Sequence, residues 1–470
     1  MQPLSALDAL FLHLETDETP MHVGVLHVMQ PPETGSRRFV DTVRDHIAAR
    51  MSSASVLTRR LRELPLGIAN PVWEAAERID LEFHIRSSRL PRPGSHAQLV
   101  EAVAARHAER LDLARPLWEF HLFEGLASGQ LALYTKVHHA ALDGAAAVAL
   151  AHALLDPTPV PRELPEKKQR PVARAGLAAL LGASLRSNAG QAARIAGRLP
   201  AAARALVTLV QSQAPNVRLA PRTPLNVAID ARRSVATASV PLASVRRVAA
   251  AHEVTINDVV LALVSGAVRR HLERLDVLPE QSLIGAMPVS LRARGDDRPT
   301  TLATMTLTEL ATDIADPLAR LKAIHGHARG AKHLAQRLEG VMPTDFPSLG
   351  LPWLLTAAAQ LYGRSRLADR VPPVANLVVS NVPGPEMPLY LAGARLESWW
   401  PLSIVEHGLG LNVTVESYAG SLDFGLVAAT RAVADLEPLA GALSESLREL
   451  EAPSRKTRAR TPRSTPRPKK

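Results

Sequence analysis

The 470-residue sequence contains no cysteine, few aromatic residues and no long apolar run. The absence of cysteine excludes disulfides, thiolate nucleophiles and cysteine-ligated metal clusters. Phe, Trp and Tyr together make up only 3% of the residues, so Leu, Val, Ile and Ala are expected to fill the core. No stretch reaches about 18 consecutive apolar residues, and residues 1–20 lack a basic start, so we expect neither a transmembrane helix nor a signal peptide.

Positive charge is concentrated at the C-terminal end of the chain. The formal net charge is +10, and residues 452–470 contain eight Lys or Arg residues and no acid, which leaves a nearly neutral remainder. This proline-containing tail lacks an apolar cluster, so we expect it to be disordered. A disordered basic tail binds polyanions in general and has no aromatic platform for bases, so no specific nucleic-acid binding is expected.

Candidate strands and helices alternate in two stretches, residues 1–155 and 223–451. The best strand lies at 131–139 and is followed by a helix at 145–155; a second strong helix lies at 257–275. These patterns predict an α/β (α+β) fold with two domains, each a mixed sheet with flanking helices. A weaker pattern predicts a strand at 80–85, and a further helix is predicted at 239–251.

A Pro-rich and Arg/Ala-rich helical crossover, residues 156–222, joins the two stretches. Four prolines between 157 and 165 favour an exposed connection. Between 171 and 213 every charged residue is an arginine. This composition has two interpretations: a basic amphipathic helix on an anionic bilayer surface, or helices packed on the protein itself, which is the commoner arrangement in globular chains.

The sequence HHAALDG, residues 138–144, closes the best strand with two adjacent histidines and an Asp-Gly turn. Because side chains alternate along a strand, His139 shares the apolar face with Val137, whereas His138 shares the other face with Lys136. A desolvated His139 would stay neutral and could take a proton from a hydroxyl. A metal site is disfavoured, because the two histidines face opposite ways and no Glu or Cys follows at ligand spacing.

HHAALDG resembles the HHxxxDG motif of acyl-CoA-dependent acyltransferases, which include chloramphenicol acetyltransferase, carnitine acyltransferases and peptide-synthetase condensation domains. Further segments resemble, in order, the bacterial wax ester synthase/acyl-CoA:diacylglycerol acyltransferase family. They are LSALDALFLHLE (4–15), PMHVG (20–24), PLW (116–118), ND (257–258), PVSLR (288–292), SNVPGP (380–385) and SY (417–418). The resemblance implies two chloramphenicol-acetyltransferase-like domains around a substrate channel.

The resemblance also implies roles for the two histidines and the aspartate of the motif. His139 is the implied general base, which deprotonates an acceptor hydroxyl for direct attack on the acyl-CoA thioester, without an acyl-enzyme. His138 is its supporting neighbour. Asp143 is implied to be structural and paired with an arginine, for which Arg292 and Arg115 are the candidates.

Residues outside the histidine pair are implied to bind the substrates or the oxyanion. Asn257 is the candidate donor to the oxyanion; alternatively it caps the helix that begins there, and it could do both. The positions implied to bind substrate are Gly144, Pro116, Trp118, Asp258, Ser380 and Asn381. Trp118 is expected to pack beside the channel, while Ser380 and Asn381 either line it or end a strand.

The expected activity is transfer of a long-chain acyl group from acyl-CoA to diacylglycerol, to a fatty alcohol, or to both. No cofactor is expected, since acyl-CoA is a co-substrate. Lipid substrates and the lack of a membrane span together predict a cytoplasmic protein attached peripherally to the inner face of a membrane or to lipid bodies. The alternatives are a related acyltransferase with another donor or acceptor, and a non-catalytic lipid-binding protein with the same fold.

Overall fold

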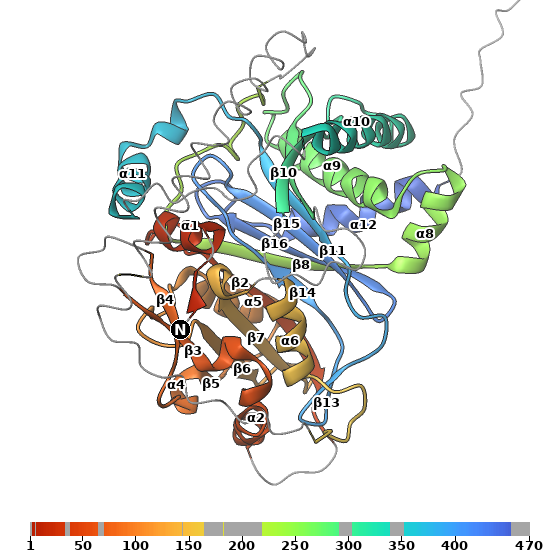
Figure 1. The fold of residues 1–470 in the computed structure, drawn as a ribbon. Coiled ribbons are helices and arrows are strands. Elements are labelled where there is room, and N and C mark those ends of the chain that lie inside the picture. Colours follow the sequence, from red (N-terminus) through yellow and green to blue (C-terminus); the bar gives the residue numbers. More distant parts are fainter. Residues whose placement is uncertain are drawn as a thin grey trace, which may run out of the picture.

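Two mixed β-sheets, one in the lower and one in the upper half of Figure 1, form the centre of the molecule, with helices packed around them. The predicted α/β fold with two sheets is thereby confirmed. The computed structural model describes residues 2–4, 6–32, 38–63, 70–142, 144–163, 182, 219–290, 303–338 and 352–452.

The lower sheet holds the strand that carries the histidine motif. Its described strands, in spatial order, are β12 (Tyr390–Leu391), β13 (Ala394–Leu396), β2 (His22–Gln30), β7 (Leu131–His138), β6 (Trp118–Glu124) and β5 (Ile85–Arg89), and β14 (Trp400–Leu402) also pairs with β2. Strand β7 is antiparallel to β2 and to β6, and His138 lies opposite His22. The predicted strand ends one residue early, because His139 begins a 3₁₀ turn, η3 (His139–Ala141).

Strands β12, β13 and β14 join the lower sheet although they lie far along the chain. Both β13 and β14 are antiparallel to β2, in which Met29 pairs with Leu396 and Leu26 with Trp400. The expected boundaries place these residues in the C-terminal domain, at 223–451. The sheets therefore do not follow those boundaries, since a C-terminal segment crosses over and completes the N-terminal sheet.

The upper sheet is built from the C-terminal half of the chain. Its described strands, in spatial order, are β10 (Ala303–Glu309), β9 (Ile284–Ser290), β11 (Leu377–Val382), β15 (Leu411–Tyr418), β16 (Ser421–Ala429) and β8 (Arg233–Pro241). Strand β11 runs parallel to β9 and β15, and the remaining pairs are antiparallel. A three-stranded sheet, β1 (Gln2–Pro3), β4 (Val72–Ala75) and β3 (Arg59–Arg62), completes the strands.

Helices cover both sheets. Those of the N-terminal half are α1 (Ala6–Leu14), α2 (Phe39–Ala48), α3 (Ser55–Thr58), α4 (Leu81–His84), α5 (His96–Ala108) and α6 (Gly144–Leu154), with η1 (Met51–Ser53) between α2 and α3. Those of the C-terminal half are α8 (Leu242–Ala251), α9 (Ile256–Arg274), α10 (Pro317–Leu338), α11 (Pro352–Ser365) and α12 (Glu437–Glu451), with η4 (Leu367–Asp369) after α11. The predicted helices at 145–155 and 257–275 correspond to α6 and α9.

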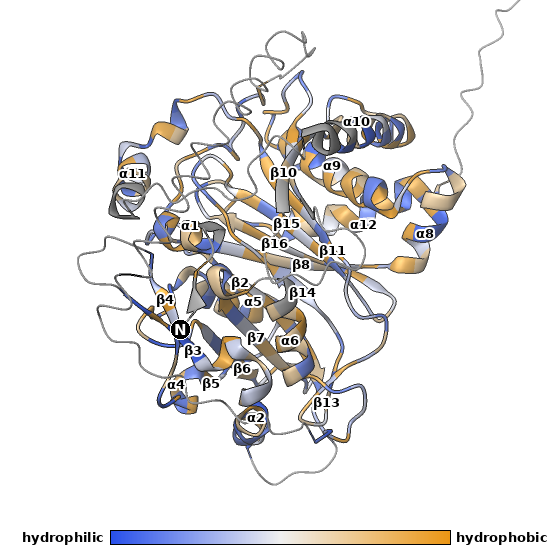
Figure 2. Ribbon diagram, viewed as in Figure 1, coloured by the Kyte–Doolittle hydropathy of each residue, from blue (hydrophilic) through white to orange (hydrophobic). Residues whose placement is uncertain are grey.

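Hydrophobic and hydrophilic residues are mixed along the strands of both sheets and in peripheral helices such as α8 (Figure 2). Residues 259–268 of helix α9 carry no charge, and the helix is buried from Asp258 to Val268, because it contacts α8, α10, α12 and strand β11. A helix that is apolar on every side is stable in water only when it is enclosed in this way. The core of the upper half is therefore formed by α9 against the sheet.

One prediction of secondary structure is wrong, and another differs from the structure only in where the helix begins. The predicted strand at 80–85 is mostly helix α4, because the Asp80 side chain accepts hydrogen bonds from the N–H groups of Glu82 and Phe83 and caps a helical turn. The predicted helix at 239–251 begins only at Leu242. Its first three residues end β8, which pairs with β16 as far as Pro241. Local propensity was overridden by sheet pairing in this second case.

The structure describes only parts of the crossover and of the C-terminal tail. Most of the expected crossover, 156–222, and all but the first residue of the expected tail, 452–470, lie outside the described residues. Within the described part of the chain, no single helix is long and apolar enough to cross a membrane; α8 and α9 reach the required length and composition only as a pair bent by 104°.

Candidate active site

A cavity of about 620 Å³ carries His139 on its wall. Its lining comes from β2, β7 and α6 in the lower half, and from the ends of β11 and β15 in the upper half, together with the β14 region. Leu133, Thr135 and Val137 of β7 share this wall with His139. The face predicted for His139 from strand alternation is therefore the face that meets the cavity.

The His139 ring is held where β7 gives way to η3. Its backbone N–H donates to the carbonyl of Met21 at 2.8 Å. The ring of Phe11 stacks on the imidazole with a centroid distance of 3.9 Å and an interplanar angle of 22°. Burial, with a smaller effect from the neighbouring His138, lowers the pKa of His139 to about 4. The imidazole is therefore neutral at pH 7 and can accept a proton.

His138 is fully buried on the opposite face of β7 and contacts Glu15. Its Nδ1 accepts a hydrogen bond from the Ala140 N–H at 3.1 Å, so a neutral ring carries its proton on Nε2. That Nε2 lies 3.5 Å from Oε1 of Glu15. The Ala140 N–H thus fixes the tautomer, and the carboxylate faces the ring nitrogen on the other side of the histidine that precedes the base.

Glu15 is buried, and three donors surround its carboxylate. It lies close to His138, accepts the Met21 N–H at 3.2 Å, and forms an ion pair with Arg110 at 2.9 Å. Burial alone would raise the pKa of Glu15, but His138, Arg110 and the Met21 N–H outweigh it, and the pKa lies below its ordinary value. The side chain is therefore a carboxylate at pH 7.

Glu15 and Phe11 are functional candidates that the sequence analysis missed. They lie four residues apart, one in α1 and one just after its last residue, and both reach the histidine pair. Their segment, residues 4–15, carried part of the resemblance to a family, but no single residue in it was singled out. The available signal was the spacing of four, which places two side chains on one face of a helix.

The SNVPGP segment, residues 380–385, enters the same cavity. Ser380 lines the wall with His139 and is partly exposed to it, as expected for a residue that lines a channel. After β11 the chain passes very close to β15, since a Cβ on Gly384 would lie 2.2 Å from the Ser417 carbonyl oxygen. Only glycine fits this approach, which explains why the segment needs glycine at this position.

Three other predicted site residues of the C-terminal half, Asn257, Asp258 and Asn381, do not line the cavity. Asn257 is the second residue of α9 and lies beside the exposed Asn381, whose amide donates to it at 3.3 Å. Neither residue belongs to the cavity wall, since β11 alternates and turns Ser380, not Asn381, toward His139. The structure therefore does not place Asn257 at the oxyanion, and it is not the cap either, because Thr255 caps α9.

Asp258 stabilises the start of α9. Its carboxylate accepts the Thr255 N–H at 2.8 Å and completes a capping box, and it is hydrogen-bonded to Nδ1 of His325 at 2.7 Å. These contacts account for the buried carboxylate without a substrate. The expectation that Asp258 binds substrate is not supported by its position.

The PLW segment belongs to the hydrophobic core beside the cavity. Trp118 is fully buried, donates its indole N–H to the Leu57 carbonyl at 3.1 Å, and stacks on His84. Pro116 forms an isolated β-bridge with Arg60. Neither residue lines the cavity, so packing against the sheet, and not substrate contact, explains both.

The partner of Asp143 lies beyond what the structure describes, because Asp143 and Arg292 are both outside the described residues. Arg115, the other candidate partner, contacts Asp112 at 3.2 Å and Asp80 at 3.7 Å. Gly144 begins α6, directly after the motif turn. Among the described residues, no three His, Asp or Glu side chains form a group that could hold a metal ion.

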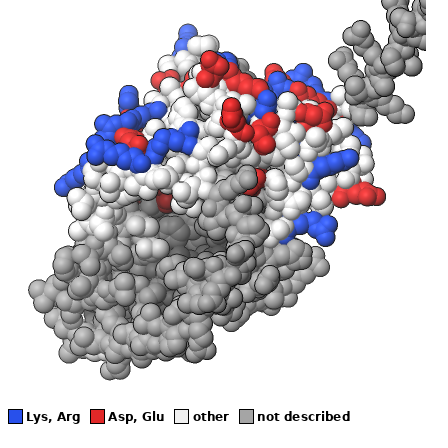
Figure 3. Space-filling model, turned by 90° about the horizontal axis from the view of Figure 1, so that it is seen from above, with Lys and Arg blue, Asp and Glu red and all other residues white. Residues whose placement is uncertain are grey.

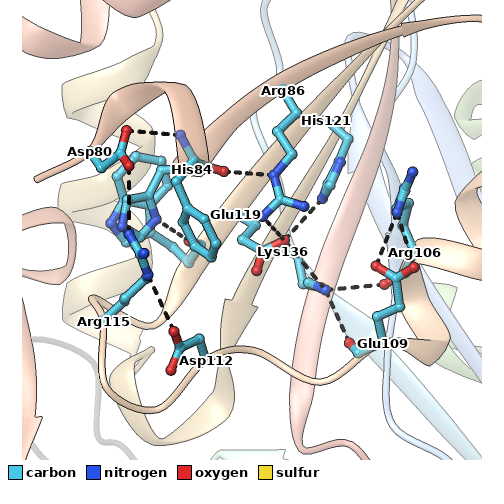
Figure 4. A network of polar contacts seen from close by, with 12 residues as sticks. Asp80, His84, Arg86, Arg106, Glu109, Asp112, Arg115, Glu119, His121 and Lys136 are labelled. Atoms are coloured by element: carbon cyan, nitrogen blue, oxygen red, sulfur yellow. Dashed lines mark hydrogen bonds and ion pairs between the residues drawn. The ribbon is translucent and has the colours of Figure 1, made fainter.

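A buried polar network supports the cavity strand from its other face (Figure 4). The Lys136 ammonium donates to the backbone carbonyls of Arg106 and Glu109 at 3.1 and 3.0 Å, at the C-terminal end of α5. It also lies 3.9 Å from the Glu119 carboxylate. A cation is favoured at a helix C-terminus, so these hydrogen bonds stabilise the packing of α5 against β7. Lys136 lies two residues before His138 in β7.

Comparison with known proteins matches this fold and these motifs over nearly the whole chain. The model of the wax ester synthase/diacylglycerol acyltransferase catalytic domain matches residues 4–260, and that of the C-terminal domain of the same family matches residues 302–451. The chain belongs to the wax ester synthase/diacylglycerol acyltransferase family. The resemblance inferred from the motifs is confirmed, and with it the expectation of an acyltransferase.

Individual members of this family resemble the chain along its length. A Mycobacterium tuberculosis protein named as a diacylglycerol O-acyltransferase is 36% identical over 449 residues, which cover 95% of this chain and 99% of that protein. The solved wax ester synthase/diacylglycerol acyltransferase from Marinobacter aquaeolei VT8 is 33% identical, with a TM-score of 0.69 and coverage of 96% and 99%. A condensation domain of a calcium-dependent antibiotic synthetase, 16% identical with a TM-score of 0.55, shares the fold.

Proposed function

We propose that this protein transfers a long-chain acyl group from acyl-CoA to the hydroxyl of a lipid acceptor, with His139 as general base. The observation that carries the proposal is a neutral imidazole on the wall of a largely apolar cavity lined by both halves of the chain. The cavity is within the usual size range of small-molecule sites. Relatives named as diacylglycerol O-acyltransferases support diacylglycerol as an acceptor.

The reaction follows from the placement of His139. The imidazole takes the proton of the acceptor hydroxyl while its oxygen attacks the thioester carbonyl carbon, which forms a tetrahedral oxyanion. When this intermediate collapses, the carbon–sulfur bond breaks, and the CoA thiolate receives the proton from the imidazolium. A base whose imidazolium is strongly acidic returns that proton readily. The products are an ester and free CoA, and no acyl-enzyme is formed.

Ser380 is the proposed donor to the oxyanion in place of Asn257. It shares the cavity wall with His139, and its hydroxyl can donate one hydrogen bond. Donors preorganised at a developing oxyanion usually contribute a large part of catalysis in acyl transfer. His138 and Glu15 act through orientation, because Glu15 fixes the ring that precedes the base.

The decisive experiment compares acceptors and a variant of the base. Purified protein is given palmitoyl-CoA with diacylglycerol, monoacylglycerol, hexadecanol or water, and free CoA is measured. We expect CoA release that depends on a lipid alcohol, and an about 100- to 10,000-fold lower rate for His139→Ala. His252→Ala, outside the cavity lining, is the matched control. Full activity of His139→Ala would refute the mechanism, and CoA release with water alone would refute the proposed transfer.

We further propose peripheral attachment to a lipid surface, since both the acceptor and the product are apolar. Exposed apolar side chains in and after α11, Leu361, Leu367 and Val371, alternate with the exposed Arg364, Arg366 and Arg370. Figure 3 shows Lys and Arg gathered on the left of the upper face, the side on which α11 lies in Figure 1. Apolar residues interleaved with arginines suit a bilayer with anionic headgroups.

A further inference from the structure

Glu416 of β15 places a carboxyl group in the apolar cavity. Among the described residues that line the cavity it is the one acidic side chain, and no Lys or Arg lines it. In the parallel pairing of β11 with β15, Ser380 lies beside Thr414, and Val382 beside Glu416. Since alternate residues share a face, Ser380, Thr414 and Glu416 form one polar strip on a wall that also carries His139.

The surroundings of Glu416 keep the carboxyl group uncharged at neutral pH. Burial, opposed in part by the Trp399 side chain and assisted by the negative charge of Asp423, raises the pKa of Glu416 to about 8. Asp423 lies opposite Glu416 in the pairing of β15 with β16. Its own carboxylate accepts hydrogen bonds from Ser239, Ser421 and the backbone N–H of Trp399, at 2.7, 2.8 and 2.7 Å.

The loop after β11 has a glycine where it crosses the Glu416 carboxyl group. A Cβ on Gly384 would lie 2.8 Å from both Cγ and Oε1 of Glu416, so the loop after β11 passes directly over the side chain. A protonated carboxyl has one O–H to donate, and an unpaired buried donor costs about 1–3 kcal/mol. A lipid alcohol with a single hydroxyl, which reacts at His139, offers no second oxygen to accept it.

We propose that Glu416 donates a hydrogen bond to an oxygen of the acceptor other than the reacting hydroxyl, such as an ester carbonyl of a glyceride. Glu416 thereby favours glycerides over simple long-chain alcohols. This inference rests on the proposed function. It assigns to the cavity a second polar subsite, next to Ser380, for an uncharged oxygen.

The test compares two acceptors with one acyl-CoA. Rates with dioleoylglycerol and with hexadecanol are measured at pH 7 in the same mixed micelles, for wild type, Glu416→Met, Glu416→Gln and the exposed control Glu101→Met. We expect the glyceride-to-alcohol ratio to fall about tenfold in Glu416→Met, as for loss of one hydrogen bond in a buried site. Glu416→Gln, which keeps a donor, should stay closer to wild type. An unchanged ratio, or equal loss with both acceptors, would overturn the inference.

A second readout uses the ionisation of Glu416. Above pH 8 the carboxyl loses its proton and its ability to donate, so the wild-type ratio should fall between pH 7 and pH 9, while that of Glu416→Gln stays flat. The other titratable or charged groups around the cavity wall, His27, His139, His152 and Asp423, are present in both proteins and affect both alike. A ratio that falls equally in both proteins would contradict the assignment.

A binding measurement separates this inference from the proposed function. Tryptophan fluorescence of the full chain, which includes Trp399 beside Glu416, is titrated with micelles that contain dioleoylglycerol or hexadecanol, without acyl-CoA. We expect tighter binding of dioleoylglycerol by wild type than by Glu416→Met, and no such difference for hexadecanol. If neither acceptor is turned over, the proposed function fails, and this titration still decides the role of Glu416. Equal binding of dioleoylglycerol by both proteins would refute it.

Discussion

The His139 imidazole is a weak base because its ring is enclosed by protein. Burial lowers the pKa of His139 to about 4, so the neutral form that accepts a proton persists at acidic pH. We predict that kcat/KM, corrected for the folded fraction by circular dichroism, changes less than about twofold between pH 7 and pH 5.5. An ordinary histidine, with a pKa near 6.5, would lose most of its activity over that range. A midpoint near pH 6.5 would therefore contradict the described burial.

Glu15 acts on the reaction through His138. Glu15→Gln removes the charge that faces His138 Nε2 but keeps the size of the side chain. We predict a kcat about 10- to 100-fold lower, because the charge that orients His138 is lost from a buried site, with KM for acyl-CoA little changed. The matched control is Asp17→Asn, since Asp17 is exposed and also contacts Arg110, at 3.0 Å. Equal effects of the two substitutions would show that the role of Glu15 lies only in binding Arg110.

Strand alternation predicted the orientation of the histidine pair but not its surroundings. The period of two in β7 placed His139 toward the cavity and His138 toward the other face, and the structure agrees. Phe11 and Glu15 reach the pair through tertiary packing of α1, which local patterns do not encode. Asn257 was assigned to the oxyanion by motif alone, and only the course of α9 shows that it lies off the cavity wall.

At the scale of elements, long periodic segments were predictable and short edge strands were not. Helix α9 and strand β7 were found within one residue of their ends because each has a strong period. Strands β12, β13 and β14 have two or three residues each and acquire their conformation from pairing with β2 and with each other. No local pattern predicts such a pairing, which joins residues more than 350 positions apart.

Helix α11 is the element on which membrane attachment can be tested. Leu361 is 67% exposed there and is accompanied by exposed arginines. We predict that Leu361→Ser lowers co-sedimentation with anionic vesicles several-fold, because it removes an apolar contact that would enter the headgroup region. The control is Leu275→Ser, which replaces a residue 47% exposed at the end of α9. If the two variants co-sediment with the vesicles to the same extent, α11 is not the surface that binds the membrane.

At the scale of the whole molecule, the two halves are joined by chain crossing as well as by packing. The segment with β12–β14 leaves the upper sheet after β11, completes the lower sheet and returns to form β15. Buried polar contacts fix this segment, since His27 of β2 contacts the Ser398 carbonyl at 3.0 Å and stands edge-on to the Trp399 ring. The cavity wall therefore depends on the lower sheet, the upper sheet and the crossing segment together.

Buried neutral histidines make the stability of this assembly sensitive to acid. Burial lowers the pKa of His27 to about 4 and that of His107 to about 3, and it also lowers the pKa of His22. In the unfolded chain these groups titrate near 6.5, so the unfolded state binds more protons below that pH. Their contribution to stability is complete above pH 6.5 and is lost as the pH falls toward 4. We expect a loss of about 3 kcal/mol from His27 alone.

The measurement is the free energy of unfolding in urea at several pH values between 7.5 and 4.5, for wild type and for His27→Gln. The variant lacks the titrating group at the junction of β2 with the crossing segment, so its free energy of unfolding should fall less steeply with acid. The difference between the two slopes isolates His27 from the other buried histidines, whatever the cost of the substitution at pH 7.5. Parallel curves for the two proteins would mean that His27 is protonated equally in the folded and unfolded states, and that the contact with Ser398 does not depend on a neutral ring.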